Sequence, residues 1–216
     1  MPETKKNRYH YDVMNCVAFF GEKQDNGTID FTNAEALKLP GLRSFEAAAN
    51  GETTKIRADG IDYIVVVSNN GYDLTLNFVQ VDDDFKVKAL GEVVDESTGI
   101  QYESADAEPV PFALVGEFKG DRENIRFIYY NVTASRPNQN GDNKENMKEP
   151  DEESLKASAS PLPVTINGED VNVVRGGVKK SNNATTWEKF LTEVVLPAGA
   201  ATQSQEPGDG NTVDGE

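Results

Sequence analysis

Few residues of this sequence have the type and spacing that a catalytic site requires. His10 is the only histidine among the 216 residues, so a Ser-His-Asp or Cys-His arrangement would have to use it. It lies in a polar segment, six residues before Cys16, where a reactive geometry would be difficult to hold. We therefore interpret His10 as a surface or interface histidine. Cys16 has alternating apolar neighbours, which indicates a small buried hydrophobic residue rather than a nucleophile.

Metal and phosphate sites are no better marked. Asp82-Asp83-Asp84 lacks the glycine and the terminal glutamate of a calcium loop, and it is more typical of the start of a helix. Neither GxxxxGK[ST] nor a GxGxxG motif after a strand is present. Acidic residues are plentiful, but nothing singles out the carboxylate pair of a glycosidase. The sequence predicts no cofactor, no metal ion and no enzymatic activity.

Composition argues against several other classes of protein. Lys and Arg total 21 against 37 Asp and Glu, a formal net charge of −16, which repels phosphate and argues against tight nucleic-acid binding. One cysteine allows no intramolecular disulfide and favours synthesis in the cytoplasm. No apolar run approaches the roughly 20 residues of a membrane span, and the N-terminus makes a poor signal peptide. We expect a soluble, acidic protein that does not bind membranes.

The elements that must position any functional residue are mostly strands. Asn26-Gly27 between two β-prone runs predicts a hairpin over residues 12–31. Residues 61–68 form a nearly continuous apolar run, which predicts a strand buried on both faces. Further strands are expected at 43–48, 92–95, 100–103, 112–118, 124–134, 155–159, 164–166 and 171–178.

One strand has a clean period of two. Its apolar positions are Tyr72, Leu74, Leu76 and Phe78, and its polar positions are Asp73, Thr75 and Asn77. One face should therefore meet the core, and the other should meet water or a polar partner surface.

Two helices are expected. The first follows Asp82 and ends at Gly91. The second starts with a capping box, Thr185 and Glu188, continues through Val194, and is stopped by Pro197.

The domain organisation follows from composition. We predict an N-terminal arm at 1–10, a β-domain at 11–196 containing a long acidic loop at 136–153, and a flexible acidic tail at 197–216.

The order of short motifs over residues 10 to 195 resembles the major tail protein (tail tube protein) family of long-tailed, non-contractile phages and of prophages of Gram-positive bacteria. The motifs of the first half are Ala58-Asp59 with Tyr63, Ser68-Asn69-Asn70-Gly71-Tyr72 and Leu90-Gly91-Glu92. Those of the second half are Glu108-Pro109, Phe112-Ala113-Leu114, Glu117-Phe118, Gly120-Asp121, Arg126, Tyr130-Asn131, Ala134, Arg136-Pro137, Lys148-Glu149-Pro150, Leu155 and Ala159-Ser160-Pro161. The sequence departs from the pattern before Ala58, over 164–180 and after Pro197.

The resemblance implies a mainly β fold, two packed antiparallel sheets in a sandwich or barrel-like tail tube fold, with a short flanking helix and a C-terminal helix. It also implies that six copies form a ring, and that rings stack into a virion tail tube through which DNA is ejected without tight binding. The implied partners are further copies of the chain and other tail proteins (tape measure, tail terminator and distal tail).

Two sets of residues follow as candidates. Asp73, Thr75 and Asn77 are candidates for facing the lumen, with an ordinary solvated face as the equal alternative. The candidates for contacts between subunits lie in the acidic loop and are Asn138, Asp142, Lys144, Glu145, Met147, Lys148 and Glu149. The main alternative function is a monomeric β-sandwich that binds carbohydrate or acts as an adhesin. A hydrolase that uses acidic residues is a second alternative.

Overall fold

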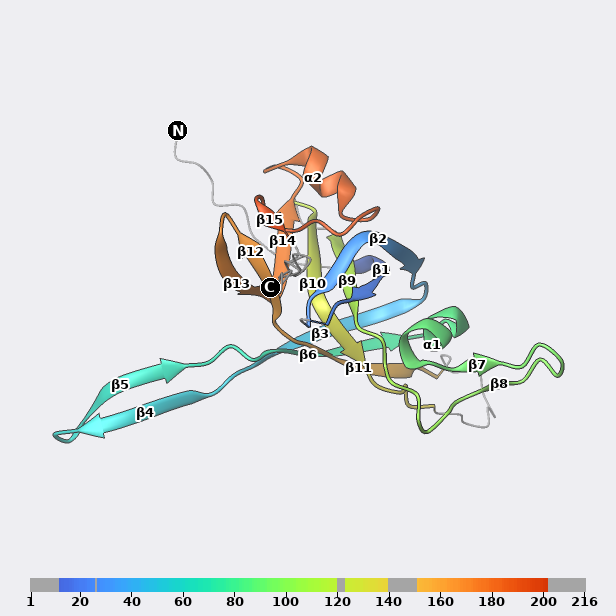
Figure 1. Cartoon of the computed structure of the whole chain (residues 1–216), viewed down its shortest axis with the longest axis horizontal. Helices are drawn as coiled ribbons and strands as arrows, with labels where there is room; N and C mark the ends of the chain where they lie inside the picture. Colours follow the sequence, from blue (N-terminus) through green and yellow to red (C-terminus); the bar gives the residue numbers. More distant parts are fainter. Residues whose placement is uncertain (1–11, 26, 120–122, 140–150, 202–216) are drawn as a thin grey trace, which may run out of the picture.

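The computed structural model describes residues 12–25, 27–119, 123–139 and 151–201, and its main element is one large antiparallel sheet (Figure 1). Seven strands run in the order β2-β1-β9-β10-β11-β6-β3, and an eighth, β14, also pairs with β10. The strands are β1 (Asp12–Lys23), β2 (Ile29–Lys38), β3 (Leu42–Asn50), β6 (Gly71–Phe78), β9 (Phe112–Lys119), β10 (Ile125–Ala134), β11 (Glu153–Ala159) and β14 (Arg175–Lys179). The predicted hairpin over residues 12–31 and the mainly β fold class are confirmed.

The large sheet coils until its two ends face each other. Strands lie about 4.8 Å apart, so β3 would be roughly 14 Å from β10 in a flat sheet. Yet the ring of Phe45 on β3 stacks on Phe127 of β10 with 4.9 Å between centroids, and it also contacts Phe118 of β9. The two packed layers of the predicted fold therefore come mainly from one sheet that folds over its own apolar face.

Two apolar clusters lie on opposite faces of β1, β9 and β10. Alternate residues of β9 divide between them, because successive side chains point to opposite faces of a strand. Phe112 and Leu114 belong to the first cluster, which the coiled sheet and α1 (Asp83–Leu90) enclose. Ala113 and Val115 belong to the second, which β12 (Leu162–Ile166) and residues 190–196 cover. The central strands are thus buried on both faces.

Helix α1 (Asp83–Leu90) has the ends that the sequence predicted. The carboxylate of Asp82 accepts hydrogen bonds from the backbone nitrogens of Asp84 and Phe85, at 3.0 and 3.3 Å. Gly91 ends the helix with a φ of 72°, a left-handed conformation that glycine adopts without strain. Phe85 and Leu90 on this helix close the first apolar cluster.

Helix α2 (Ala184–Lys189) is shorter than predicted and begins differently. Its N-cap is Asn183, whose side chain accepts a hydrogen bond from Thr186 N at 3.0 Å, so the capping box at Thr185 and Glu188 is wrong. The helix ends at Lys189, eight residues before Pro197, because Phe190 is buried in the second cluster and the residues after it also pack there. Tertiary packing overrides the helical periodicity of this segment.

A small sheet follows the order β13-β12-β15, formed by β12 (Leu162–Ile166), β13 (Glu169–Val173) and β15 (Ala200–Ala201). The predicted strand at 171–178 is therefore two strands, β13 and β14. The backbone of β15 pairs with Thr165 and Ile166, so the predicted flexible tail starts too early, at 197. None of the helices in the described ranges is long and apolar enough to cross a membrane.

A buried ion pair ties α2 to the sheet. Arg126 Nε lies 3.1 Å from Glu117 Oε2, and both side chains are less than a tenth exposed. The same guanidinium donates to the backbone oxygen of Trp187 at 2.5 Å and lies 3.3 Å from the centre of the Trp187 ring. Asn15 also donates to Glu117 Oε2, at 3.0 Å. Removing the cation from such a pair leaves an uncompensated buried charge, which destabilises the fold.

We expect Arg126→Met to lower the free energy of unfolding by about 3–5 kcal/mol, because Glu117 would keep a buried charge without its cation. Urea unfolding followed by circular dichroism measures this. Arg57→Met, at a side chain that is 74% exposed, is the control and should change the stability by no more than about 0.5 kcal/mol. Equal stabilities for the two variants would contradict a structural role for the pair.

The thiol of Cys16 is predicted to be inert in the native protein, because burial raises its pKa to about 12 and keeps it protonated at neutral pH. A thiol-reactive dye should label the chain only in denaturant. Labelling of the native chain at the rate of a free cysteine would show that the first cluster opens there.

Candidate assembly surfaces

The three candidate lumen residues lie together on the exposed face of β6. Asp73 is exposed and Thr75 and Asn77 are half-buried, whereas Leu74 and Leu76 are buried beneath them. The alternation predicted for this strand is therefore confirmed. Whether the polar face lines a channel remains a prediction.

This face continues onto both neighbouring strands. Residues directly opposite each other in a sheet share a face. The register places Ser44, Glu46 and Ala48 of β3, and Ser154, Lys156 and Ser158 of β11, beside the three residues of β6. We call these nine residues the polar sheet face. Its charged members are Glu46, Asp73 and Lys156, and the others are hydroxyl, amide and methyl groups.

Hydrogen bonds within the polar sheet face hold its side chains. Asn77 Nδ2 donates to Ser44 Oγ at 2.8 Å, and Asn50, at the end of β3, donates to Asp73 at 3.4 Å. The result is a polar surface with little net charge, which offers phosphate no cluster of cations.

A second surface is the hairpin β4 (Thr53–Ala58) and β5 (Ile61–Val67), which extends far from the body (Figure 1). It continues the ribbon formed by β3 and β6, through the backbone hydrogen bonds Asn70 N to Asn50 O and Ser68 N to Glu52 O. Gly71 marks the exit from the body, where its φ is 106° and a Cβ would lie 1.9 Å from the oxygen of Ala159. We call β4–β5 the projecting hairpin.

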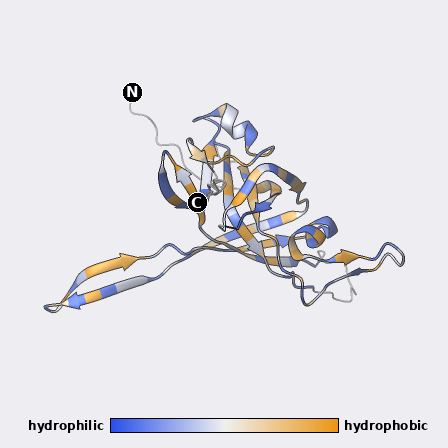
Figure 2. Ribbon diagram, in the orientation of Figure 1, coloured by the Kyte–Doolittle hydropathy of each residue, from blue (hydrophilic) through white to orange (hydrophobic). Residues whose placement is uncertain are grey.

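The projecting hairpin corrects the prediction that 61–68 is buried on both faces. Its apolar side chains are between 45% and 71% exposed, and they are Ile56, Ile61, Tyr63, Ile64, Val65, Val66 and Val67. Figure 2 shows β5 as a hydrophobic strand in this exposed position. Among the described residues β4 and β5 pair only with each other, and the exposure of these side chains shows that neither face packs against the body.

Its two faces differ in chemistry. The register pairs Thr54 with Val66, Ile56 with Ile64 and Ala58 with Ile61, so these six uncharged residues share a face. The opposite face carries Lys55 and Arg57, which both bind the Asp62 carboxylate, at 2.9 and 3.0 Å. We call the first the uncharged hairpin face.

A local signal for this hairpin was missed. Asp59 and Gly60, between the two strands, have φ values of 53° and 80°, as in the two-residue turns that Asp-Gly favours. The turn predicts a hairpin, but no local pattern distinguishes a strand covered by its own chain from one left for a partner.

The hairpin β7 (Val93–Val94) and β8 (Gln101–Tyr102) lies at the opposite end of the molecule (Figure 1). Its exposed apolar residues are Val93, Val94, Ile100 and Tyr102. Residues 92–103 hold four carboxylates and neither lysine nor arginine, so we call them the acidic hairpin. The turn is closed by Asp95, which accepts hydrogen bonds from the hydroxyls of Ser97 and Thr98 at 2.6 and 2.8 Å. These bonds lower the pKa of Asp95 to about 2, so it is charged at neutral pH.

The acidic loop is largely outside the described residues. Asn138 is exposed and its backbone forms an isolated antiparallel bridge with Ser154. Asp142, Lys144, Glu145, Met147, Lys148 and Glu149 lie outside the described residues, as does His10.

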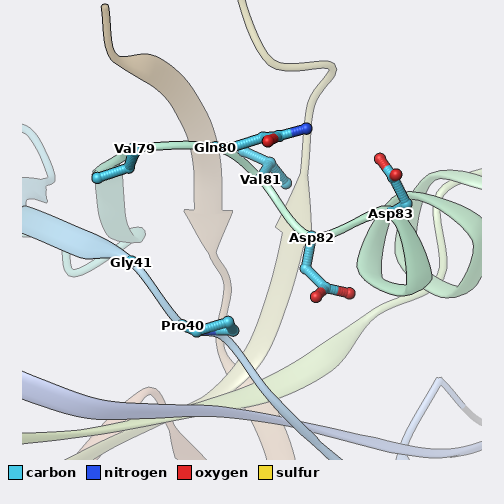
Figure 3. A pocket seen from close by; sticks show the side chains of 7 residues that line it. All are labelled: Pro40, Gly41, Val79, Gln80, Val81, Asp82 and Asp83. Carbon is cyan, nitrogen blue, oxygen red and sulfur yellow. The ribbon is translucent and has the colours of Figure 1, made fainter. Parts of the chain in front are cut away.

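Two hollows of the surface contain no catalytic arrangement of described side chains. One, of about 380 Å³, lies between Pro40-Gly41 and residues 79–83 (Figure 3). Its two carboxylates point in opposite directions, and both have partners, since Asp82 caps α1 and Asp83 binds Lys86 at 3.1 Å. A second, of about 600 Å³, has Cys16 and Lys38 as its ionisable lining residues.

Metal binding has no support in the described ranges either, where no three His, Cys, Asp or Glu residues come together as a candidate site. The features with functional potential in the part of the chain that the structure describes include three surfaces: the polar sheet face, the projecting hairpin and the acidic hairpin. Neither the protein-family models nor the curated proteins provide a match to this chain.

Proposed function

We propose that this chain is a structural protein that assembles with copies of itself, as the tail tube protein of a long-tailed, non-contractile phage. Six copies form a ring, and stacked rings enclose the channel through which DNA leaves the capsid. The chain acts without enzymatic activity, in the virion tail, after synthesis in the cytoplasm of a bacterial host. Its other partners are the tape measure, tail terminator and distal tail proteins.

The observation that carries this proposal is the projecting hairpin. An isolated two-stranded hairpin is marginally stable in water, and covering one large aliphatic side chain stabilises by about 1.5–3 kcal/mol. Six such exposed side chains on one hairpin, together with Tyr63, favour association, and apolar patches of this kind mark interaction sites. Both long edges also keep unpaired backbone groups, which another chain can pair with.

Self-association is favoured over a carbohydrate-binding module by the placement of these residues. Carbohydrate sites use concave surfaces with a few aromatic and polar groups. The projecting hairpin is a convex, mostly aliphatic element whose single aromatic residue is Tyr63.

The net negative charge of the chain favours a role in the wall of a DNA channel. A ring of six copies would carry six times the formal charge of −16, or −96. Affinity for DNA comes from lysine and arginine contacts to phosphate, and an acidic wall reduces it. The polar sheet face fits the wall of such a channel, since it has one cation, Lys156, beside two carboxylates.

The purified chain should form rings or tubes of uniform diameter with a central channel at moderate concentration, as seen by negative-stain microscopy and size-exclusion chromatography. A chain that stays monomeric at every concentration and binds glycans on an array would instead support the carbohydrate-binding alternative.

Ile56→Asp combined with Ile64→Asp should raise the concentration needed for assembly at least tenfold, because both carboxylates lie on the uncharged hairpin face and the cost of burying them exceeds about 1.4 kcal/mol. Analytical ultracentrifugation measures the assembly, and near-ultraviolet circular dichroism should show an unchanged body. Val171→Asp, at an exposed valine of β13, is the control. Normal assembly of the double variant would exclude the projecting hairpin from the contact.

A further inference from the structure

The molecule has two exposed apolar elements, one at each end of its longest axis. The projecting hairpin lies at one end and the acidic hairpin at the other (Figure 1). Each is a two-stranded hairpin with no third strand among the described residues, so each leaves backbone groups unpaired along its edges. The two ends of the molecule therefore carry different exposed hairpins.

The acidic hairpin has the properties of a surface on which another copy of the chain could pack. Val93 and Tyr102 lie opposite each other in the register, so they share one face. Val94 pairs with Gln101 and lies on the opposite face. The side chains of Val93, Val94, Ile100 and Tyr102 are all between 44% and 60% exposed. Exposed apolar side chains flanked by carboxylates match the usual arrangement of an interface with an apolar centre and a polar rim.

The two hairpins are complementary in charge. The acidic hairpin carries Glu92, Asp95, Glu96 and Glu103, of which Glu103 is bound by Arg136 at 2.5 Å. The projecting hairpin carries two cations, Lys55 and Arg57, that share the single carboxylate of Asp62. Their side chains are 57% and 74% exposed, so they are accessible to carboxylates of another molecule. Complementary charge of this kind sets the register of an interface.

We propose that the projecting hairpin of one copy packs its uncharged face on the acidic hairpin of the next copy, with Lys55 and Arg57 beside the acidic rim. This inference rests on the proposed self-assembly and names the surface that receives the hairpin. The contact is heterologous, since two different surfaces meet. Repeated from copy to copy, it closes a ring or builds a filament, whereas pairing of two projecting hairpins would stop at a dimer and leave the acidic hairpin uncovered.

Two introduced cysteines, one on each hairpin, test the contact. Tyr63→Cys places a thiol on the projecting hairpin and Ile100→Cys places one on the acidic hairpin, both at side chains at least 60% exposed in the native chain. The buried thiol of Cys16 stays protonated and does not compete. A short bismaleimide linker joins neighbouring thiols without demanding the geometry of a disulfide. Near-ultraviolet circular dichroism verifies that each variant is folded.

An equimolar mixture of the two variants should give a covalent dimer, and the variant carrying both substitutions should give a ladder of multiples. Each single variant alone should stay monomeric on a denaturing gel. Asp25→Cys, on the exposed β1–β2 turn, replaces either partner as the control and should not cross-link.

The other outcomes separate this inference from the proposed function. A dimer formed by Tyr63→Cys alone would show hairpin-to-hairpin pairing and overturn the contact. Rings that form normally while the mixture gives no cross-link would overturn the contact but keep the tube function. A chain that neither assembles nor cross-links would overturn both.

Discussion

The coiling of the large sheet is the constraint on which the rest of the structure depends. By bringing Phe45 of β3 onto Phe127 of β10, it converts one face of a single sheet into an enclosed core and leaves the other face of β3, β6 and β11 in solvent. The same fold directs the β3–β6 ribbon past the edge of the body, where it continues as the projecting hairpin. One packing arrangement therefore decides the core, the polar sheet face and the direction of the hairpin.

The body is stabilised independently of the surfaces proposed for assembly. Its two apolar clusters, closed by α1 on one side and by β12 and Phe190 on the other, contain none of the exposed residues of the projecting hairpin. The Arg126–Glu117 pair joins the sheet to α2 within this body. Because these contacts are internal, we expect the body to fold without the apolar residues of the two hairpins, whose exposure has a cost in water that association would relieve.

A structural protein that assembles in one direction needs two different surfaces that face opposite ways. The projecting and acidic hairpins have these properties, with cations on the first and carboxylates on the second. A conduit for DNA further needs a wall without clustered cations, and the polar sheet face meets that condition. The proposed function thus follows from where apolar and charged residues lie on the surface, rather than from a reactive group.

The sequence by itself determined several of the local elements, because turn and cap chemistry is local. Asn26-Gly27 predicted the first hairpin, the alternation of 72–78 predicted one buried and one polar face, and Asp82 with Gly91 predicted both ends of α1. It also identified Asp73, Thr75 and Asn77 as neighbours on one face, since residues two apart on a strand always are.

The tertiary structure alone decided which surfaces are covered. The apolar run at 61–68 has the composition of a buried strand, and only the path of β3 and β6 shows that it lies in water. The segment after Lys189 has helical spacing, yet Phe190 packs into the second cluster and the helix ends. In both segments the residue pattern predicts that the apolar side chains are buried. Which residues bury them depends on contacts with parts of the chain that are distant in the sequence, or with another copy.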